Sequence, residues 1–326
     1  MAYFSPLSPA GRNAKLAIFI FHRVLAAPDA LRPDEPDIIR FERIVRFIRK
    51  AYVPMTVSEA SGRLIDGSLP AAAACITFDD GYADNYTLAA PILAKWRVPA
   101  TFFIATSYIE GGCMWNDSVI EAIRMASSGI LELTSFGLGR HKLSDASSRH
   151  NACKTILQQL KYFSQEKRDS ISFEIGKISG LPSDLAPMMT TKQLRALRKL
   201  GMELGAHTET HPILERVSDN QAEAEIRLSK EQLERILNET VTSFAYPNGR
   251  PNKDYSFRHA EMVRQAGFSV AVSTEQGIAT SASDIFQLPR FTPWDTNIAK
   301  FALRSGLSLL RADGGFGASR PPSKNI

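Results

Sequence analysis

Short apolar runs alternate with helical patterns over most of this chain of 326 residues, and this alternation limits the possible folds more than any other feature. The pattern is typical of parallel strands joined by helical crossovers, so it predicts an α/β protein. A closed barrel is one option, because α/β barrels run to roughly 250 residues as single domains. The runs that we predict to be strands are residues 16–21, 74–78, 101–105, 202–206, 242–246, 269–273 and 286–289.

Helical patterns fill the segments between these runs. Residues 41–48 have apolar side chains at i, i+3, i+4 and i+7, with arginines on the opposite face. We expect that arginine face to be solvated, with an anionic membrane surface as the alternative. Residues 190–201 and 218–237 begin with the spacing of a capping box, which predicts two more helices. Residues 113–187 are mostly polar and helical in pattern, and we interpret them as an insertion.

The composition indicates a globular domain that folds without disulfides. Hydrophobic residues make up 44% of the chain and charged residues 22%, which is enough for a full core. The net charge of +5 is too small to indicate nucleic-acid binding by itself. The three cysteines form no C-x-x-C pair, which argues against cysteine-bound zinc and favours a reducing compartment. We predict a single domain over residues 1–310 and a disordered tail over residues 311–326.

The sequence also bears on targeting. The first residues lack the charged start, apolar run and small-residue cleavage site of a secretory signal. The longest dense apolar stretch is residues 16–21, whereas roughly 20 apolar residues are needed to span a bilayer. We therefore expect a cytoplasmic protein without a transmembrane segment.

Polar residues follow the carboxyl ends of several predicted strands. In parallel α/β barrels these ends build the active face, so polar residues that gather there predict a functional site. The residues concerned are His22, the pair Asp79 and Asp80, His207, the segment 247–249, and Arg290.

Two of these groups suggest a metal site. Adjacent carboxylates repel each other unless a cation or a shared proton separates their roles, and a glycine follows Asp79 and Asp80. His207 and His211 are four residues apart, which suits one metal ion if the backbone between them turns. Two histidines and one carboxylate form a three-ligand site with an open position, and the second carboxylate remains as a base. The alternatives are a surface turn and two exposed loop histidines.

These motifs resemble those of the polysaccharide deacetylases, carbohydrate esterase family 4, over residues 16–290. The resemblance implies a distorted seven-stranded (β/α) barrel, with Asp79 as catalytic base and Asp80 as metal ligand. It also implies that His207 and His211 are metal ligands. A third motif, residues 244–249, resembles the loop whose backbone helps to hold the oxyanion, and it contains Tyr246, Pro247 and Asn248.

Two positions depart from the common family pattern. Ala245 stands where many members have an arginine against the catalytic aspartate, and Arg290 stands where many have the histidine that acts as general acid. An arginine does not give up its proton, so we predict that His22 is the acid and that Arg290 pairs with Asp79. A histidine that only caps its strand is the alternative.

The chain is most similar to the exopolysaccharide deacetylase branch of the family. Phe21-His22-Arg23-Val24 and Phe244-Ala245-Tyr246-Pro247 resemble segments of that branch, as do Trp115 and Asp117. Trp115 is a possible supporting residue of the site, and an ordinary packed tryptophan is the alternative.

The predicted function is removal of the acetyl group from an N-acetylated amino sugar, in a polysaccharide, an oligosaccharide or a glycan precursor. The ligand set favours zinc as the divalent metal, with cobalt, nickel and manganese as alternatives. Two other functions remain open. One is hydrolysis of a different non-peptide C–N bond on the same fold, and the other is a catalytically silent carbohydrate-binding protein.

Overall fold

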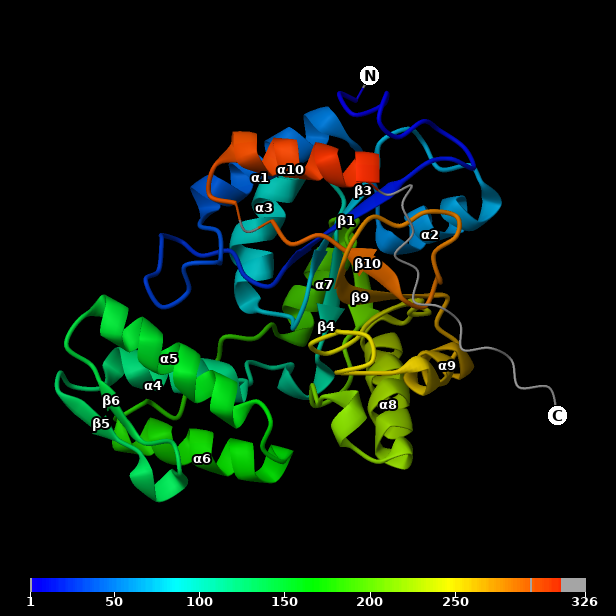
Figure 1. The fold of residues 1–326 in the computed structure, drawn as a ribbon. Helices are drawn as coiled ribbons and strands as arrows, with labels where there is room; N and C mark the ends of the chain where they lie inside the picture. Colours follow the sequence, from blue (N-terminus) through cyan, green and yellow to red (C-terminus); the bar gives the residue numbers. More distant parts are fainter. Residues whose placement is uncertain (1, 294, 312–326) are drawn as a thin grey trace.

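A parallel sheet that closes into a barrel forms the centre of the structure, and helices surround it (Figure 1). The computed structural model describes residues 2–293 and 295–311. All seven predicted strands are present within a few residues of their predicted bounds, so the predicted barrel fold is confirmed. In sheet order they are β1 (Leu16–Phe21), β3 (Ala73–Phe78), β4 (Thr101–Ile104), β7 (Glu203–Ala206), β8 (Ser243–Ala245), β9 (Val270–Gln276) and β10 (Leu288–Arg290).

Neighbouring strands along this path all run parallel. The sheet path closes where the segment after β10 returns to β1. Phe291 donates its N–H to the carbonyl of Ile18 at 2.7 Å and accepts from the N–H of Ile20 at 3.1 Å. Ala279 exchanges two further backbone hydrogen bonds with Leu16, at 2.8 and 2.9 Å. A short strand that the sequence did not predict, β2 (Val53–Pro54), pairs with β3 outside this path.

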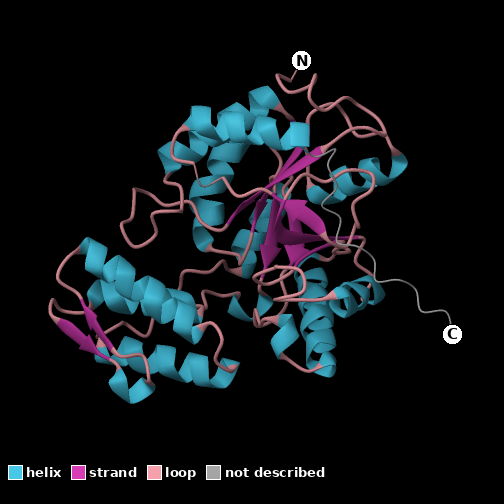
Figure 2. Cartoon of the chain, viewed as in Figure 1, coloured by secondary structure: helices cyan, strands magenta, loops and turns pink. Residues whose placement is uncertain are grey.

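Helices cover the outer face of the barrel (Figure 2). The three helices predicted from periodicity and capping are confirmed, as α1, α7 and α8. No helix among the described residues has the length and apolar content needed to cross a membrane. The helices around the barrel are α1 (Ile38–Ala51), α3 (Ala90–Trp96), α7 (Thr191–Lys199), α8 (Asp219–Leu237), α9 (Phe257–Gln265) and α10 (Ile298–Arg311). α2 (Val57–Asp66) instead lies at the amino end of the barrel, where its buried side chains pack with the inward side chains of the strands.

The segment predicted to be an insertion projects from one side of the barrel (Figure 1). It has its own hydrophobic core, which includes Val119, Ile123, Ile156 and Ile175. An antiparallel hairpin lies within it and was not predicted, because its strands have only three residues each and are mostly exposed. The elements of the insertion are α4 (Trp115–Met125), β5 (Ile130–Glu132), β6 (Arg140–Lys142), α5 (Ala146–Leu160) and α6 (Gln165–Ile178).

The C-terminal tail predicted at residues 311–326 lies outside the described residues, apart from Arg311 at the end of α10. Its disorder therefore stays a prediction.

Side chains of each barrel strand alternate between two apolar clusters. Ile76 and Phe78 of β3 pack outward against the helices, whereas Ala73 and Cys75 pack into the barrel. This alternation follows from the two-residue period of a strand. Both faces are buried, which explains why the strands read as continuous apolar runs rather than as alternating ones.

Candidate active site

The inward rows of the barrel strands end in polar side chains at the carboxyl edge. On β3 the inward row passes through Cys75 and reaches Asp79, which is 2% exposed. By the same period, Ile18 leads to His22 on β1, and Leu288 leads to Arg290 on β10. The strand period therefore places these polar side chains at one end of the barrel interior.

Asp80 reaches the same place through a break in the strand geometry. Strict alternation would turn its side chain outward, but its φ is +75°, and Gly81 follows with a φ of +93°. Both values are left-handed, which glycine adopts at little cost and aspartate tolerates better than most residues. A side chain at Gly81 would also come within 3.3 Å of Ile104. The turn thus directs the Asp80 carboxylate toward His207 and His211, which follow β7 on the far side of β4.

Asp80, His207 and His211 form a compact group of possible ligand atoms. Asp80 Oδ1 is 3.5 Å from His207 Nε2 and 3.3 Å from His211 Nε2. One ligand atom from each residue lies within 4.8 Å of the other two. The structure therefore brings together the three residues that the sequence predicted as metal ligands.

Hydrogen bonds fix the orientation of both histidines. His207 Nδ1 lies 2.7 Å from the carbonyl oxygen of Ala245. Because a carbonyl can only accept, Nδ1 carries the proton and Nε2 presents its lone pair toward Asp80. The backbone N–H of His211 donates to Thr208 Oγ1 at 3.1 Å, and both residues have left-handed φ values of +59° and +63°.

The loop between the histidines is held by Glu225, which the sequence analysis missed. Glu225 lies in α8, is 5% exposed, and accepts from the N–H groups of Glu209 and Thr210 at 2.9 and 2.8 Å and from the Thr210 hydroxyl. Periodicity gives no signal for this contact, because it joins a helix to a loop that lies fifteen residues away.

The protonation states make this group a set of electron-pair donors. Burial lowers the pKa of His211 to about 4, despite the nearby Asp80 carboxylate, so the ring is neutral at pH 7. Burial raises the pKa of Asp80, but the electrostatic effect of the neighbouring His211 and His22 outweighs it and lowers the pKa below its usual value. A carboxylate thus faces two imidazole nitrogens.

This donor set fits a divalent cation. Ligand atoms about 2.0–2.1 Å from a tetrahedral cation lie about 3.4 Å apart, close to the two Asp80–histidine distances. Two imidazoles and a carboxylate are ligands that zinc accepts, and three protein ligands leave a position free for substrate or water. Without a cation, the Asp80 oxygen and the His207 lone pair would repel each other.

Asp79 is paired with Arg290 inside the barrel. Arg290 is fully buried, and its two terminal nitrogens each lie 2.7 Å from one oxygen of Asp79. The Nε of Arg290 also donates to the carbonyl of Ser273, and Nη1 to Thr77 Oγ1. Burial raises the pKa of Asp79, but the guanidinium outweighs it and holds the pKa below the ordinary value. Asp79 is therefore ionised at neutral pH.

His22 lies at the end of β1, within electrostatic reach of both aspartates. Burial lowers the pKa of its ring, but the carboxylates of Asp80, Glu35 and Asp79 outweigh this and raise the pKa above 6.5. Its backbone carbonyl accepts from Asn85 Nδ2 at 2.9 Å, which holds the backbone at this strand end.

The loop predicted to hold the oxyanion offers one free backbone donor. The N–H of Tyr246 bonds to the carbonyl of Val272, and Pro247 has no N–H. Among residues 2–293 and 295–311, no hydrogen bond uses the N–H of Asn248, whose φ is +61°. The Tyr246 side chain is buried, with its hydroxyl donating to Phe286 and its ring stacked on Tyr255, so it packs in the core.

Trp115 lies in the insertion rather than among the three donors. It begins α4, and the guanidinium of Arg168 lies over its ring at 5.0 Å. Two residues further along, Asp117 joins a buried group with Arg23 and Tyr82 that sequence reasoning did not assemble, because its members come from three separate segments.

Comparisons with known proteins bear on the family and the fold. A family model described as polysaccharide deacetylase matches residues 66–271. The Bacillus subtilis (strain 168) protein YxkH is 23% identical over 281 residues, which cover 86% of this chain and 71% of YxkH.

The solved structures that share the fold include PplD and IcaB. The Streptococcus pyogenes deacetylase PplD, in complex with acetate, matches with a TM-score of 0.57 at 20% identity, over 86% of this chain and 92% of PplD. IcaB from Ammonifex degensii matches with a TM-score of 0.56 at 16% identity, over 93% of this chain and 98% of IcaB.

Proposed function

The chain belongs to the polysaccharide deacetylase family, and on this premise we propose that it is a metal-dependent hydrolase that removes acetyl groups from an N-acetylated amino sugar. The observation that carries the proposal is that Asp80, His207 and His211 converge, while the ionised Asp79 next to them is not one of the three possible ligands. A binding site alone would have no need for that second carboxylate.

Asp80, His207 and His211 would hold the divalent cation, with zinc favoured by the ligand types. When bound, the cation supplies Lewis acidity, which polarises the amide carbonyl and makes water a better nucleophile at neutral pH. His207 keeps its Nε2 available for this role through the hydrogen bond from Nδ1 to Ala245.

Asp79 is proposed as the general base. Arg290 keeps it ionised, and each carboxylate oxygen has a second lone pair that can accept a proton from the attacking water. The same arginine fixes the direction of the carboxylate through two parallel hydrogen bonds. Arg290 thus takes the place of the family arginine that is absent at Ala245.

Asn248 is proposed to stabilise the negative charge that develops on the carbonyl oxygen. Its N–H is the one donor of the loop 246–248 without an intramolecular partner among the described residues. A preorganised backbone donor of this kind contributes to catalysis because it needs no reorganisation in the transition state.

His22 is proposed to protonate the departing amine. Its raised pKa keeps the ring protonated further toward neutral pH than a free histidine, and it ends a strand next to β10 in the closed barrel. Arg290 cannot do this, because a guanidinium in a protein keeps its proton.

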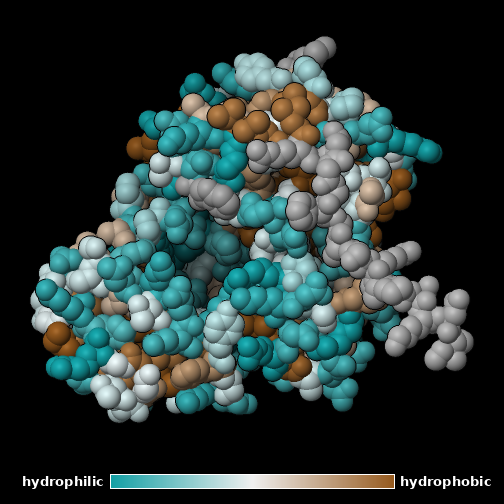
Figure 3. Space-filling view, viewed as in Figure 1, coloured by the Kyte–Doolittle hydropathy of each residue, from teal (hydrophilic) through white to brown (hydrophobic). Residues whose placement is uncertain are grey.

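The surface agrees with a polar substrate. Figure 3 shows a hollow between the insertion and the barrel, bordered mainly by hydrophilic residues. A sugar chain presents hydroxyl and amide groups that need hydrogen-bond partners, so a polar hollow suits it better than an apolar pocket would.

The test is acetate release from a panel of N-acetylated oligosaccharides and of nucleotide-linked and lipid-linked sugars. We expect release by the wild type, loss after chelation and recovery with zinc. Asp79→Asn should keep the metal and lose roughly 100-fold to 10,000-fold in turnover, because an amide cannot accept the proton. Metal-loaded protein that binds these sugars without releasing acetate would instead establish the carbohydrate-binding alternative.

A further inference from the structure

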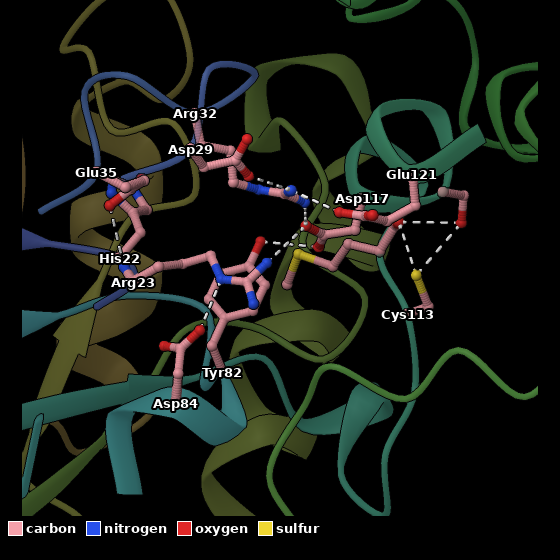
Figure 4. Close-up of polar contacts among 12 residues, drawn as sticks. His22, Arg23, Asp29, Arg32, Glu35, Tyr82, Asp84, Cys113, Asp117 and Glu121 are labelled. Carbon is pink, nitrogen blue, oxygen red and sulfur yellow. Dashed lines mark hydrogen bonds and ion pairs between the residues drawn. The ribbon is translucent and has the colours of Figure 1, made fainter. Parts of the chain in front are cut away.

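A buried group of charged residues joins the insertion to the catalytic edge of the barrel (Figure 4). Its centre is Asp117, in the first turn of α4, which is 1% exposed. Asp117 accepts hydrogen bonds from the Tyr82 hydroxyl at 2.9 Å, from Arg32 Nη2 at 2.8 Å and from Arg23 Nη1 at 3.4 Å. Three donors from two loops of the barrel therefore meet at one carboxylate of the insertion.

Each loop also carries a residue of the proposed active site. Tyr82 follows Gly81 directly, so it ends the turn that directs Asp79 and Asp80. Arg23 follows His22 directly, and its guanidinium carbon lies 4.4 Å from the centre of the Tyr82 ring. Asp117 thus fixes the neighbours of the proposed base and of the proposed acid.

Asp84 completes the connection between the two loops. Arg23 Nε donates to Asp84 Oδ2 at 2.8 Å, and Asp84 Oδ1 accepts from the N–H of Val24 at 3.3 Å. Arg23 therefore lies between one carboxylate of the barrel and one of the insertion. Figure 4 shows its side chain extended between Asp84 and Asp117.

The far end of the insertion holds the same turn from the other side. The N–H of Ala83 donates to the carbonyl of Pro187 at 2.8 Å, and the N–H of Met189 donates to the carbonyl of Gly81 at 2.9 Å. Backbone hydrogen bonds hold the turn there, whereas at Asp117 a side chain holds it, and a single substitution can change that side chain.

We propose that Asp117 is a positioning residue. Through Tyr82 and Arg23 it holds the Asp79–Asp80 turn and His22 in a fixed position relative to each other. The inference rests on the proposed function, because it assigns these neighbours to the reaction. It makes the insertion a part of the catalytic apparatus rather than an appendage. Groups that orient catalytic or ligand residues typically change metal affinity or activity 10-fold to 100-fold when they are removed.

The experiment compares Asp117→Asn with Glu203→Gln. Glu203 is a matched control, because it too accepts hydrogen bonds from several side chains, those of Ser58, Thr101 and Ser243, but at the amino end of β7. At saturating zinc we expect Asp117→Asn to lower kcat 10-fold to 100-fold with KM within about twofold of wild type. Glu203→Gln should lower the melting temperature and leave kcat within about twofold.

Tyr82→Phe removes one hydroxyl and keeps the test decisive if Asp117→Asn does not fold. We expect it to lower kcat several-fold, and the double variant to be no worse than Asp117→Asn alone, because both changes break one connection. A kcat within twofold of wild type in Asp117→Asn, or in Tyr82→Phe if the first variant does not fold, overturns the inference. So does an equal loss in Glu203→Gln.

Failure of the proposed function gives a different result. If the wild type releases no acetate from any substrate, zinc affinity measured by competition with a chelating dye becomes the readout. Asp117→Asn should then bind zinc at least 10-fold more weakly than both wild type and Glu203→Gln. Equal affinities would overturn the positioning role independently of the reaction.

Discussion

Replacing Arg290 by glutamine should show how much the buried pair with Asp79 contributes. The side chains of Arg290 and Asp79 are 0% and 2% exposed, and two hydrogen bonds of 2.7 Å join them. Glutamine removes the positive charge and leaves the Asp79 carboxylate buried without a counter-ion. Removing one partner of a buried ion pair costs about 3–5 kcal/mol of unfolding free energy, because the remaining charge stays desolvated.

This change in unfolding free energy can be converted to a shift in melting temperature. An unfolding entropy of about 2.1 cal/mol/K per residue means that 1 kcal/mol shifts the melting temperature of a chain of this length by about 1.5 °C. The expected decrease for Arg290→Gln is therefore about 4–7 °C. Arg198→Gln is the control, because the side chains of its pair with Glu239 are 46% and 37% exposed. Such a surface pair contributes only about 0–1 kcal/mol.

The loss of stability in Arg290→Gln should also depend on pH, and the direction of this dependence follows from the pKa of Asp79. In the wild type this pKa is lowered, so the contribution to stability is present above the unfolded value of about 3.9 and is lost as the pH falls through the folded pKa. In Arg290→Gln burial remains and raises the pKa, so ionised Asp79 opposes folding. The difference between variant and wild type should therefore be largest at pH 7 and shrink toward pH 4.

The assay is urea unfolding of the chelator-treated proteins at several pH values, since a bound cation would also neutralise the carboxylates. A deficit for Arg290→Gln below about 1 kcal/mol at pH 7, the range of a surface pair, would refute the reasoning. A deficit that grows as the pH falls would show that the burial of Asp79 is not the cause.

Three further changes test other parts of the site. His22→Gln should lower turnover at least about 100-fold with unchanged metal content, because the amide cannot donate the proton that the amine needs; turnover close to wild type would make His22 structural. Glu225→Gln should weaken zinc affinity about 10-fold to 100-fold by releasing the loop before His211, whereas Glu231→Gln, on the exposed side of the same helix, should not. Gly205→Ala should destabilise the barrel by about 1–3 kcal/mol in urea unfolding, because its Cβ would lie 2.6 Å from Phe103 Cδ1; an unchanged midpoint would contradict this packing.

The barrel could be predicted from the sequence because its strands are buried on both faces. Continuous apolar runs such as residues 16–21 stand out against the polar helices, and the polar residue after each run marks the carboxyl edge. His22, Asp79, His207 and Arg290 could therefore be placed at one edge from the sequence alone. The hairpin of β5 and β6 could not, since three-residue strands that are mostly exposed carry no periodic signal.

Contacts between distant segments mark the limit of such reasoning. Arg290 could be predicted to face Asp79 because the closed barrel places β10 and β3 on either side of β1, although the two residues are 211 positions apart in sequence. The roles of Glu225 and Asp117 depend on how a helix lies against a loop, and periodicity gives only the buried face of a helix. The sequence pattern of an acidic residue next to an apolar one, as at Glu225, is the same whether the acidic side chain faces water or a buried loop.

The way in which the barrel closes also protects the chain from self-association. The six residues of β1, Leu-Ala-Ile-Phe-Ile-Phe, have high strand propensity, no charge and no proline, which is the composition that stacks into cross-β aggregates when its edge is free. Ala279 and Phe291 occupy that edge through four backbone hydrogen bonds, although they belong to separate irregular segments. Partial detachment of residues 279–291 would therefore expose a strand able to template the stacking of other molecules, so the segment that supplies Arg290 to the site also keeps the protein from aggregating.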